Sequence, residues 1–313
     1  MLHKVKRRDV LLMAAAAPIS AARAPVLLPG FRKQTIQTTG ARINVLTGGQ
    51  GPPVLLLHGY PQTHVIWHKI APVLAREFTI VLTDLRGYGD SAKPSGGPGH
   101  EQYAKRAMAL DQVEVMRRLG HETFAVIGHD RGGRVAHRMA LDHAQQITRV
   151  AVLDIVPTHY LFTNLTKEAA EAFYNWFFLI QPAPYPETII HNGVDSYLRQ
   201  QLARAGSAIT PAAYAEYLRC FRDPASIHAT CEDYRAAATI DLAHDQADLN
   251  RKISCPLLVL WGEKGRLPRL YDVLETWRSR AQNVRGRGLP CTHFLPEEAP
   301  AECLQEFRRF LTA

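Results

Sequence analysis

Short apolar runs recur along the chain, separated by polar or helix-forming segments. Five of these runs are rich in leucine and β-branched residues, and they cover Val54–Leu57, Thr79–Leu82, Phe124–Ile127, Val150–Leu153 and Leu257–Leu260. Each is soon followed by Gly, Asp or Pro, and then mostly by residues with helical spacing. Strands without polar alternation are buried on both faces. The pattern therefore predicts an α/β fold with a mostly parallel sheet flanked by helices.

The pattern changes between Pro157 and about Asp245. Aromatic residues with helix-like spacing replace the buried-strand runs, as in AFYNWFFLI and AAYAEYLRCF, and the sheet pattern resumes at Leu257. We therefore expect an inserted helical domain, the cap, over residues 157–245. The α/β core would then consist of residues 25–156 and 246–313.

The first 24 residues differ from the rest of the chain. They combine a basic start, an Ala-rich apolar run and a small-residue ending at Ala24, which is typical of an export signal. Arg7 and Arg8 resemble the twin-arginine type, so we expect residues 1–24 to direct export to the bacterial periplasm. A basic tail on a cytoplasmic protein and a helix resting on a membrane remain alternatives. No later apolar run has the length of a membrane span, so no stable membrane association is expected after signal removal.

The net charge of +8 depends partly on this N-terminal segment. Five Lys or Arg residues against one Asp give it +4, which leaves +4 for the other residues of the 313-residue chain. These charges are scattered, without a basic run interleaved with aromatics, so nucleic-acid binding is not expected. A mild positive balance favours a small anionic substrate. A homodimer is left open.

The cysteine and histidine spacings do not indicate a metal site. The five cysteines form no CxxC pair, although one disulfide in an exported protein stays open. His64 and His68 have i, i+4 spacing, but no third ligand is evident. We expect no metal and no cofactor.

The segment GHDRGGR, residues 128–134, follows a buried strand and opens a helix near Arg131. It has the form of a nucleophile elbow, Gly-x-Ser-x-Gly, with Asp130 in the place of the serine. A carboxylate at that tip is suited to displace a leaving group from carbon and form an ester. The alternative is that Asp130 only caps the helix.

Two further loops supply candidate partners for Asp130. The His-Gly loop in LLLHGYPQ would place the backbone N–H of Tyr60 beside that of Arg131 as an oxyanion hole, unless the loop is only a tight turn. His293, in LPCTHFLPEEAP, lies before the last predicted helix and is the candidate base, with a purely structural loop histidine as the alternative. Asp154, at the end of a predicted strand, is the expected acid that orients His293. Glu263 is its rival, and Asp154 could instead cap the entry to the cap.

Arg131 and Arg134 lie at i, i+3 in the first helical turn, where a positive charge opposes the helix dipole. A pair of guanidiniums beside the nucleophile would hold a substrate carboxylate. Salt bridges to acidic residues of the cap are the structural alternative.

Several motifs together resemble the haloacetate (fluoroacetate) dehalogenases of the α/β-hydrolase superfamily. They are HGYPQ, TDLRGYGDSAKP, GHDRGGR, HRMALDH, VLDIVPT, FLIQPAPYPE, CEDYRAAATID and HFLPEEAP, and the likeness covers nearly everything after residue 30. The resemblance implies an α/β-hydrolase fold in which Asp130 displaces halide from a 2-haloacetate and His293, oriented by Asp154, activates water to release glycolate. It also implies that Arg131 and Arg134 hold the substrate carboxylate.

The same resemblance implies a halide pocket in the cap. Trp176 and Tyr234 match two of its positions, while Asn175 stands where the family has a histidine. Indole, phenol and amide groups are all hydrogen-bond donors, so Asn175 also belongs to the candidate set. Trp176 and Tyr234 as plain core residues of the cap are the alternative. The segment RQQLARAGSAIT is a few residues short, and it lacks a further pocket tryptophan of the family.

Two other functions remain open. An epoxide hydrolase uses the same Asp-His-Asp machinery, and it would need hydroxyls such as that of Tyr234 with Tyr160 or Tyr174. A pair of guanidiniums argues against a neutral epoxide as substrate. A non-catalytic ligand-binding protein with this fold is less favoured, because the three reactive residues are intact.

Overall fold

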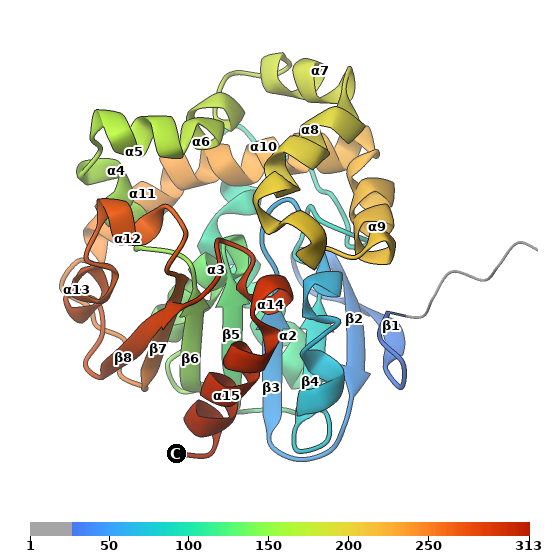
Figure 1. The fold of residues 1–313 in the computed structure, drawn as a ribbon, viewed down its shortest axis with the longest axis vertical. Coiled ribbons are helices and arrows are strands. Elements are labelled where there is room, and N and C mark those ends of the chain that lie inside the picture. Colours follow the sequence, from blue (N-terminus) through green and yellow to red (C-terminus); the bar gives the residue numbers. More distant parts are fainter. Residues whose placement is uncertain (1–26) are drawn as a thin grey trace, which may run out of the picture.

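The computed structural model describes residues 27–313, and an eight-stranded sheet lies at their centre (Figure 1). The expected export signal, residues 1–24, lies outside the described residues. In chain order the strands are β1 (Arg32–Gln37), β2 (Arg42–Gly48), β3 (Pro53–Leu57), β4 (Thr79–Thr83), β5 (Phe124–His129), β6 (Ile147–Leu153), β7 (Leu257–Gly262) and β8 (Val284–Leu289).

The strand order across the sheet is β1-β2-β4-β3-β5-β6-β7-β8. Strand β2 pairs antiparallel with both β1 and β4, and the other neighbours are parallel. The predicted mostly parallel sheet is confirmed, and the five apolar runs became strands β3 to β7.

Three strands were not expected from the sequence. β1 reads RKQTIQ and β8 reads VRGRGL, and most residues of each are exposed or half-buried. Both are edge strands, so neither has the continuous apolar sequence of a strand covered on both faces. β2 has buried residues, but a polar Asn44 interrupts its run.

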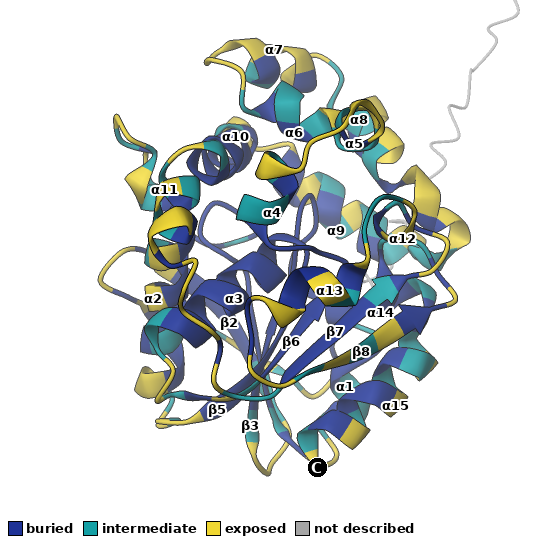
Figure 2. Cartoon of the chain, turned by 90° about the vertical axis from the view of Figure 1, so that its left-hand side faces the viewer, coloured by how far each residue is buried: buried dark blue, intermediate teal, exposed yellow. Residues whose placement is uncertain are grey.

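Helices cover both faces of the sheet, as the alternation of side chains in β3 shows. Leu55 and Leu57 pack in one core cluster, whereas Val54 and Leu56 pack in a second cluster. Figure 2 shows that the central strands are buried almost throughout. The first cluster includes residues of α2 (Lys105–Arg118), α3 (Arg131–Asp142) and α13 (Val273–Arg278). The second includes residues of η1 (His64–Trp67), α1 (Ala71–Leu74), α14 (Leu295–Glu298) and α15 (Pro300–Leu311).

The chain between β6 and β7 is helical and lies over one end of the sheet (Figure 1). Its elements are α4 (Thr158–Thr163), α5 (Lys167–Ala172), α6 (Tyr174–Leu179), α7 (Tyr185–His191), α8 (Val194–Leu202), η3 (Ala203–Ala208), α9 (Pro211–Phe221), α10 (Pro224–Ala238) and α11 (Ile240–Ala247). The expected cap, 157–245, contains α4 to α10 and most of α11. The remaining short helices are η2 (Glu101–Tyr103) and α12 (Leu267–Leu270).

Candidate active site

Asp130 lies at a sharp turn between β5 and α3. Its backbone has φ 48° and ψ −114°, a conformation that residues other than glycine rarely adopt. A Cβ atom on Gly132 would lie 2.4 Å from the His58 carbonyl oxygen, so the turn requires glycine there. The Asp130 side chain makes no capping hydrogen bond to α3. The turn therefore presents the carboxylate beyond the end of β5, and the helix-capping alternative lacks its defining bond.

Tyr60 follows β3 and binds one oxygen of this carboxylate. Its backbone N–H donates to Asp130 Oδ1, with 2.9 Å between nitrogen and oxygen. Gly59 permits the approach, because a Cβ atom there would lie 2.4 Å from the Asp130 Cβ. Within residues 27–313, Oδ2 accepts no hydrogen bond. The N–H of Arg131, expected as a second oxyanion donor, stays a prediction.

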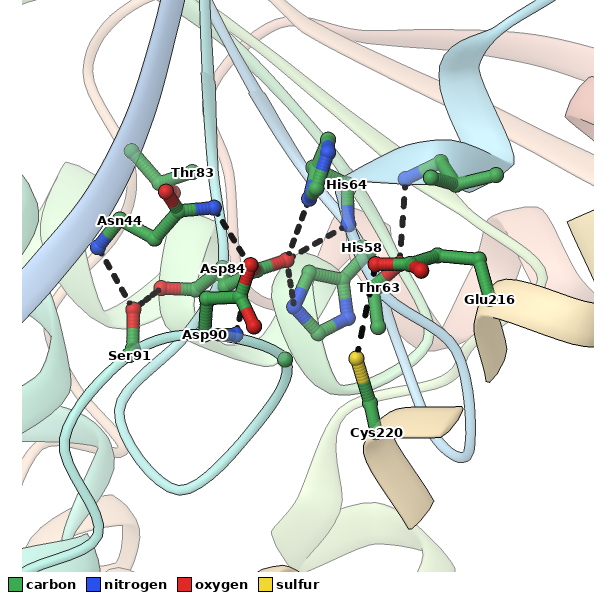
Figure 3. Close-up of polar contacts among 12 residues, drawn as sticks. Asn44, His58, Thr63, His64, Thr83, Asp84, Asp90, Ser91, Glu216 and Cys220 are labelled. Atoms are coloured by element: carbon green, nitrogen blue, oxygen red, sulfur yellow. Dashed lines mark hydrogen bonds and ion pairs between the residues drawn. The ribbon is translucent and has the colours of Figure 1, made fainter. Parts of the chain in front are cut away.

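A buried carboxylate supports the loop that carries Tyr60 (Figure 3). Asp84 Oδ1 accepts from the His64 backbone N–H at 2.9 Å and from His64 Nδ1 at 2.8 Å. Beside it, His58 Nε2 accepts from the Leu85 backbone N–H at 3.0 Å. Burial alone would raise the pKa of Asp84, but the charge and hydrogen bonds of His64 hold it well below the usual range. This ionised carboxylate ties the loops after β3 and β4 together.

His293 lies in the loop after β8, near Asp130. Its Nδ1 donates to Asp154 Oδ2 at 2.6 Å, and Asp154 Oδ1 accepts from the Gly262 backbone N–H at 2.9 Å. This pairing fixes the ring tautomer and leaves Nε2 free to accept a proton. Nε2 lies 3.9 Å from Asp130 Oδ2, too far for a good hydrogen bond and suited to a water molecule between them. Among the described residues the carboxylate bonded to His293 is that of Asp154, and Glu263 makes no such bond.

His129 supports the His293 loop through a hydrogen bond. It was not among the residues predicted from the sequence. Its Nε2 donates to the His293 carbonyl oxygen at 2.8 Å. Burial lowers the pKa of His129 to about 3, so the ring is neutral at physiological pH. The sequence feature that could have identified His129 is its position directly before Asp130 in the elbow.

The surroundings of Asp130 favour its ionised form. Burial raises the pKa of this carboxyl, but electrostatic interactions with His293 and His129 and with the charges of Arg131 and Arg134 outweigh burial and lower it overall. Only an ionised carboxylate is an effective nucleophile toward carbon. The site therefore favours an Asp130 carboxylate that is ionised at neutral pH.

The two arginines of the elbow have different partners. Arg131 is fully buried, and its Nε and Nη2 donate to the two carboxylate oxygens of Asp233 in α10, each at 2.8 Å. Its Nη1 has no partner within the described chain. Arg134 Nη1 donates to the Val156 carbonyl and the Thr158 hydroxyl, at 3.0 and 2.8 Å. Arg131 thus forms the salt bridge to an acidic cap residue that was its structural alternative.

Of these two arginines, Arg134 lines the cavity that contains Asp130, whereas Arg131 is not among the lining residues. Burial and the like charge of Arg131 lower the pKa of Arg134 to about 10, so it remains a cation at neutral pH. Its guanidinium carbon lies 4.5 Å from the centroid of the Trp176 ring. The site therefore combines the Asp130 carboxylate and a cation in one cavity.

This cavity is narrow, with a volume of about 60 Å³, and it lies between the core and the cap. It is lined by Tyr60, Pro61, Asp130, Arg134, Asp154, Ile155, Leu161, Phe173, Asn175, Trp176, Gln201, Arg204, Tyr234, Arg266, Leu267, His293 and Phe294. The structure thus brings together the candidates for nucleophile, base, orienting acid and halide binding.

The three expected halide-binding residues, Asn175, Trp176 and Tyr234, all line this cavity. In the part of the chain that the structure describes, their side chains donate no hydrogen bond to a protein acceptor. Burial and the charge of Asp130 raise the pKa of Tyr234, so its hydroxyl keeps its proton. Trp176 and Tyr234 also pack in the core, with ring centroids 5.2 Å apart. Core packing and a donor role are therefore compatible at these two positions.

Comparison with known proteins identifies the family. The model of the α/β-hydrolase fold family matches residues 52–300. The chain belongs to the α/β-hydrolase family. The resemblance stated above is confirmed, since this hydrolase is 44% identical to a fluoroacetate dehalogenase from Burkholderia sp. over 91% of the chain and 95% of that relative. A soluble epoxide hydrolase from Corynebacterium sp. (strain C12) is 34% identical, over 83% of the chain and 90% of its own length. A solved structure of a putative α/β hydrolase from Nostoc sp. PCC 7120 is 60% identical, with a TM-score of 0.89 over 90% of the chain and 98% of its own.

Three polar residues of the hydrolase's cavity were missed by the sequence analysis. Gln201 and Arg204 come from the end of α8 and from η3, and Arg266 comes from the loop after β7. Arg204 lies in RQQLARAGSAIT, the segment that seemed short of a pocket tryptophan. The missing tryptophan indicated that this segment differs from the family, but no periodicity indicated that an arginine in it reaches the cavity.

The remaining site expectations concern metals, disulfides and membranes. In residues 27–313 of the hydrolase, no cluster of three or more His, Cys, Asp or Glu side chains could hold a metal ion. His64 is bonded to Asp84, and His68 Nδ1 to the Val65 carbonyl. All five cysteines are free thiols. Among the helices described, none has the length and apolar character needed to cross a membrane.

Proposed function

We propose that this hydrolase cleaves the carbon–halide bond of a 2-haloacetate, giving glycolate and halide through an ester on Asp130. The observation that carries the proposal is the cavity that contains Asp130, the Arg134 guanidinium and three donors that have no acceptor within residues 27–313. A haloacetate has one group for each of these features, namely an electrophilic carbon, a carboxylate and a leaving halide. The 44% identity to a fluoroacetate dehalogenase supports the same reaction.

In the first half-reaction, Asp130 Oδ2 attacks the carbon that bears the halogen. Oδ1 is held by the Tyr60 N–H, which leaves Oδ2 as the free nucleophile. Arg134 binds the substrate carboxylate and fixes the neighbouring carbon for in-line displacement. The halide departs with the bonding electron pair toward Asn175, Trp176 and Tyr234, whose N–H and O–H groups replace part of its hydration.

In the second half-reaction, water attacks the carbonyl carbon of the Asp130 ester. His293 Nε2 takes a proton from that water, and Asp154 stabilises the resulting imidazolium. The negative charge that develops on Oδ1 lies beside the Tyr60 N–H. As this intermediate collapses, His293 returns its proton to the departing oxygen and glycolate is released. Asp130 is left as a carboxylic acid, which loses the second proton of the water and becomes the carboxylate again.

An epoxide hydrolase would use the same residues, but the cavity supports it less well. Tyr234 lines the cavity, whereas the two residues considered as a second tyrosine, Tyr160 and Tyr174, do not. Tyr60 lines it too, yet its hydroxyl is hydrogen-bonded to that of Tyr197 at 2.8 Å. A buried guanidinium at Arg134 also has no role toward a neutral epoxide.

The test measures halide and glycolate released from fluoroacetate, chloroacetate and bromoacetate, with a styrene-oxide-type epoxide in parallel. We expect equal amounts of halide and glycolate and no turnover by Asp130→Asn. A single turnover in heavy-oxygen water should place the label on Asp130 and leave glycolate unlabelled. Epoxide turnover without halide release would instead establish the epoxide hydrolase.

The variant Arg134→Ala further distinguishes a haloacetate dehalogenase from an epoxide hydrolase. We expect kcat/KM for chloroacetate to fall by about 100-fold, the effect of losing a hydrogen-bonded charge partner. Arg134→Lys keeps the charge without the guanidinium fork and should lose less. An equal loss of activity toward chloroacetate and an uncharged substrate would contradict the assigned role of Arg134.

A further inference from the structure

Arg204 and Arg266 add two positive charges to the lining of the cavity. Arg204 lies on η3 of the cap and Arg266 precedes α12 of the core, so they approach the cavity from different parts of the chain. Arg266 Nη1 donates to the Ala172 carbonyl oxygen. Within the described chain, neither guanidinium forms an ion pair with a carboxylate, and Arg204 donates no hydrogen bond.

No carboxylate of the described chain pairs with either guanidinium, whereas Arg131 pairs with Asp233 and Arg86 pairs with Asp111. Arg204 is exposed and Arg266 is half-buried. Arg204 and Arg266 instead repel each other, since burial and the charge of Arg204 lower the pKa of Arg266. Partial burial also lowers the pKa of Arg204, against the attraction of Asp154, Glu298 and Asp130. Two cations that line one cavity without an ion-pair partner form a site that an anion would stabilise.

A haloacetate does not account for these two arginines. Its single carboxylate has to lie beside the carbon that Asp130 attacks, and Arg134 binds it there in the proposed function. A second anionic group on the substrate would reach Arg204 and Arg266, which line the same cavity, while the first remains at Arg134. Guanidinium forks match carboxylates in both charge and geometry.

We propose that Arg204 and Arg266 bind a second carboxylate, so that the preferred substrates are 2-halogenated dicarboxylates such as 2-chlorosuccinate. The inference rests on the proposed function for the reaction itself, but the binding site it describes can be measured separately. The bonds that form and break are the same as for a haloacetate. Asp130 Oδ2 forms a bond to the halogen-bearing carbon, halide leaves with the electron pair, and water cleaves the ester to a 2-hydroxydicarboxylate and a proton.

The first experiment measures binding, which needs no turnover. Calorimetric titration of the wild-type protein with succinate and with acetate compares a dianion with a monoanion, neither of which carries a leaving group. We expect succinate to bind at least about 10-fold more tightly than acetate, as expected for one added charge-assisted contact. Arg204→Gln and Arg266→Gln should each reduce this preference. Arg199→Gln removes the same charge from α8, where Arg199 pairs with Asp195 outside the cavity, and should leave the preference unchanged. Equal affinities for succinate and acetate in the wild type would overturn the proposal.

The second experiment compares kcat/KM for 2-chlorosuccinate and chloroacetate in the same variants. We expect Arg204→Gln to lower the value for 2-chlorosuccinate by about 10-fold more than that for chloroacetate. Equal losses for both substrates would mean that the two arginines only attract anions in general, and would refute the second carboxylate site. Absence of halide release from every substrate would reject the dehalogenase function, while the succinate titration would still decide whether the dicarboxylate site exists.

Discussion

The two oxygens of Asp130 have different environments, and this difference assigns them different roles. Oδ1 accepts from the Tyr60 N–H, whereas Oδ2 lies on the side of His293 Nε2. An oxygen without a hydrogen bond is the better nucleophile, because its lone pairs are not engaged. The oxygen beside a backbone donor is the one on which negative charge is stabilised when the ester is hydrolysed. In the proposed mechanism, both half-reactions would therefore use one carboxylate without a change of its orientation.

This arrangement predicts that loss of the His293 base stops the reaction half-way. In His293→Asn, Asp130 would still displace halide, but no group would activate water for the second half-reaction. We expect a burst of one halide per protein molecule, followed by turnover at least about 100-fold slower than in the wild type. Intact-mass analysis should detect a carboxymethyl group on the protein, and peptide mapping should locate it on Asp130.

A double variant provides the control for that burst. Asp130→Asn combined with His293→Asn should release no halide and gain no mass. A covalent adduct on another residue, or a burst that survives the loss of Asp130, would contradict the assignment of the nucleophile.

Helix α10 is connected to α3 and α2 through one buried carboxylate. Asp233 receives two hydrogen bonds from Arg131, one from the Tyr88 hydroxyl at 2.6 Å, and a close contact from Lys105. Burial would raise the pKa of Asp233, but the charges of Arg131 and Lys105 lower it strongly. The network therefore anchors the cap helix that carries Tyr234 to the helix that begins at the nucleophile.

We predict that Asp233→Asn destabilises the protein severely. It leaves the buried Arg131 without its anion, while Lys105 keeps Asp241 at 3.3 Å, and breaking a buried pair in this way costs about 3–5 kcal/mol. Urea denaturation should show this loss in the free energy of unfolding. Asp195→Asn, which disrupts the exposed ion pair with Arg199, should change the stability little. A comparable effect of the two substitutions would show that the buried network does not stabilise the fold.

Glu297 links α14 to α9 and to the loop that contains Gln62. Its environment predicts a specific pH dependence of the stability. It lies on α14 and accepts from Gln62 Nε2 at 2.6 Å and from the Tyr217 hydroxyl of α9 at 3.0 Å. Burial raises the pKa of Glu297 from 4.5 to about 8. The folded state then holds a proton that the unfolded state releases above about pH 4.5, so stability falls as pH rises from there to about 8.

Glu297→Gln should remove this part of the pH dependence. Glutamine remains neutral, so the variant should match the wild type near pH 5 and exceed its free energy of unfolding at pH 8, by at most about 5 kcal/mol. Denaturation curves at both pH values measure the difference. Glu302→Gln on α15 serves as a carboxylate control and should follow the wild type. A parallel pH dependence of Glu297→Gln and the wild type would show that the carboxyl ionises normally.

The strands that were predicted from the sequence are those whose hydrophobic pattern results from burial on both faces of the sheet. Strands β3 to β7 have continuous apolar sequences because helices cover each side of the sheet. The edge strands β1 and β8 expose polar side chains, and their pairing depends on neighbours that no local pattern identifies. Local sequence thus predicted the centre of the sheet and left out its edges.

The same reasoning separates the predicted from the missed site residues. Asp130, Asp154 and His293 follow strands or lie in motifs, so their positions at one end of the sheet were predictable. Arg204 and Arg266 reach the cavity only through the packing of the cap on the core. The partner of Arg131 was also open from sequence, because Asp233 is about a hundred residues away in the chain.

For the whole molecule, the expected export signal leads to a prediction about the mature protein. Expression of the full chain in a bacterium with a twin-arginine pathway should give a periplasmic form that begins after Ala24. N-terminal sequencing and fractionation measure this directly. Substitution of Arg7 and Arg8 by Lys should retain the full-length chain in the cytoplasm. Unprocessed wild-type protein in the cytoplasm would favour the alternative of a basic tail.

The buried Asp84 cluster belongs to the core, the part of the molecule that must stay fixed, whereas the residues of the cap can change. It anchors the Tyr60 loop to the core strands, and Asp130, Asp154 and His293 also follow core strands. Asn175, Trp176, Arg204 and Tyr234, by contrast, belong to the cap. Directed evolution limited to cap positions should therefore change which halide and which acid are accepted while the bond-breaking apparatus stays intact. New specificities for halogenated pollutants would then be accessible from this scaffold without redesign of its chemistry.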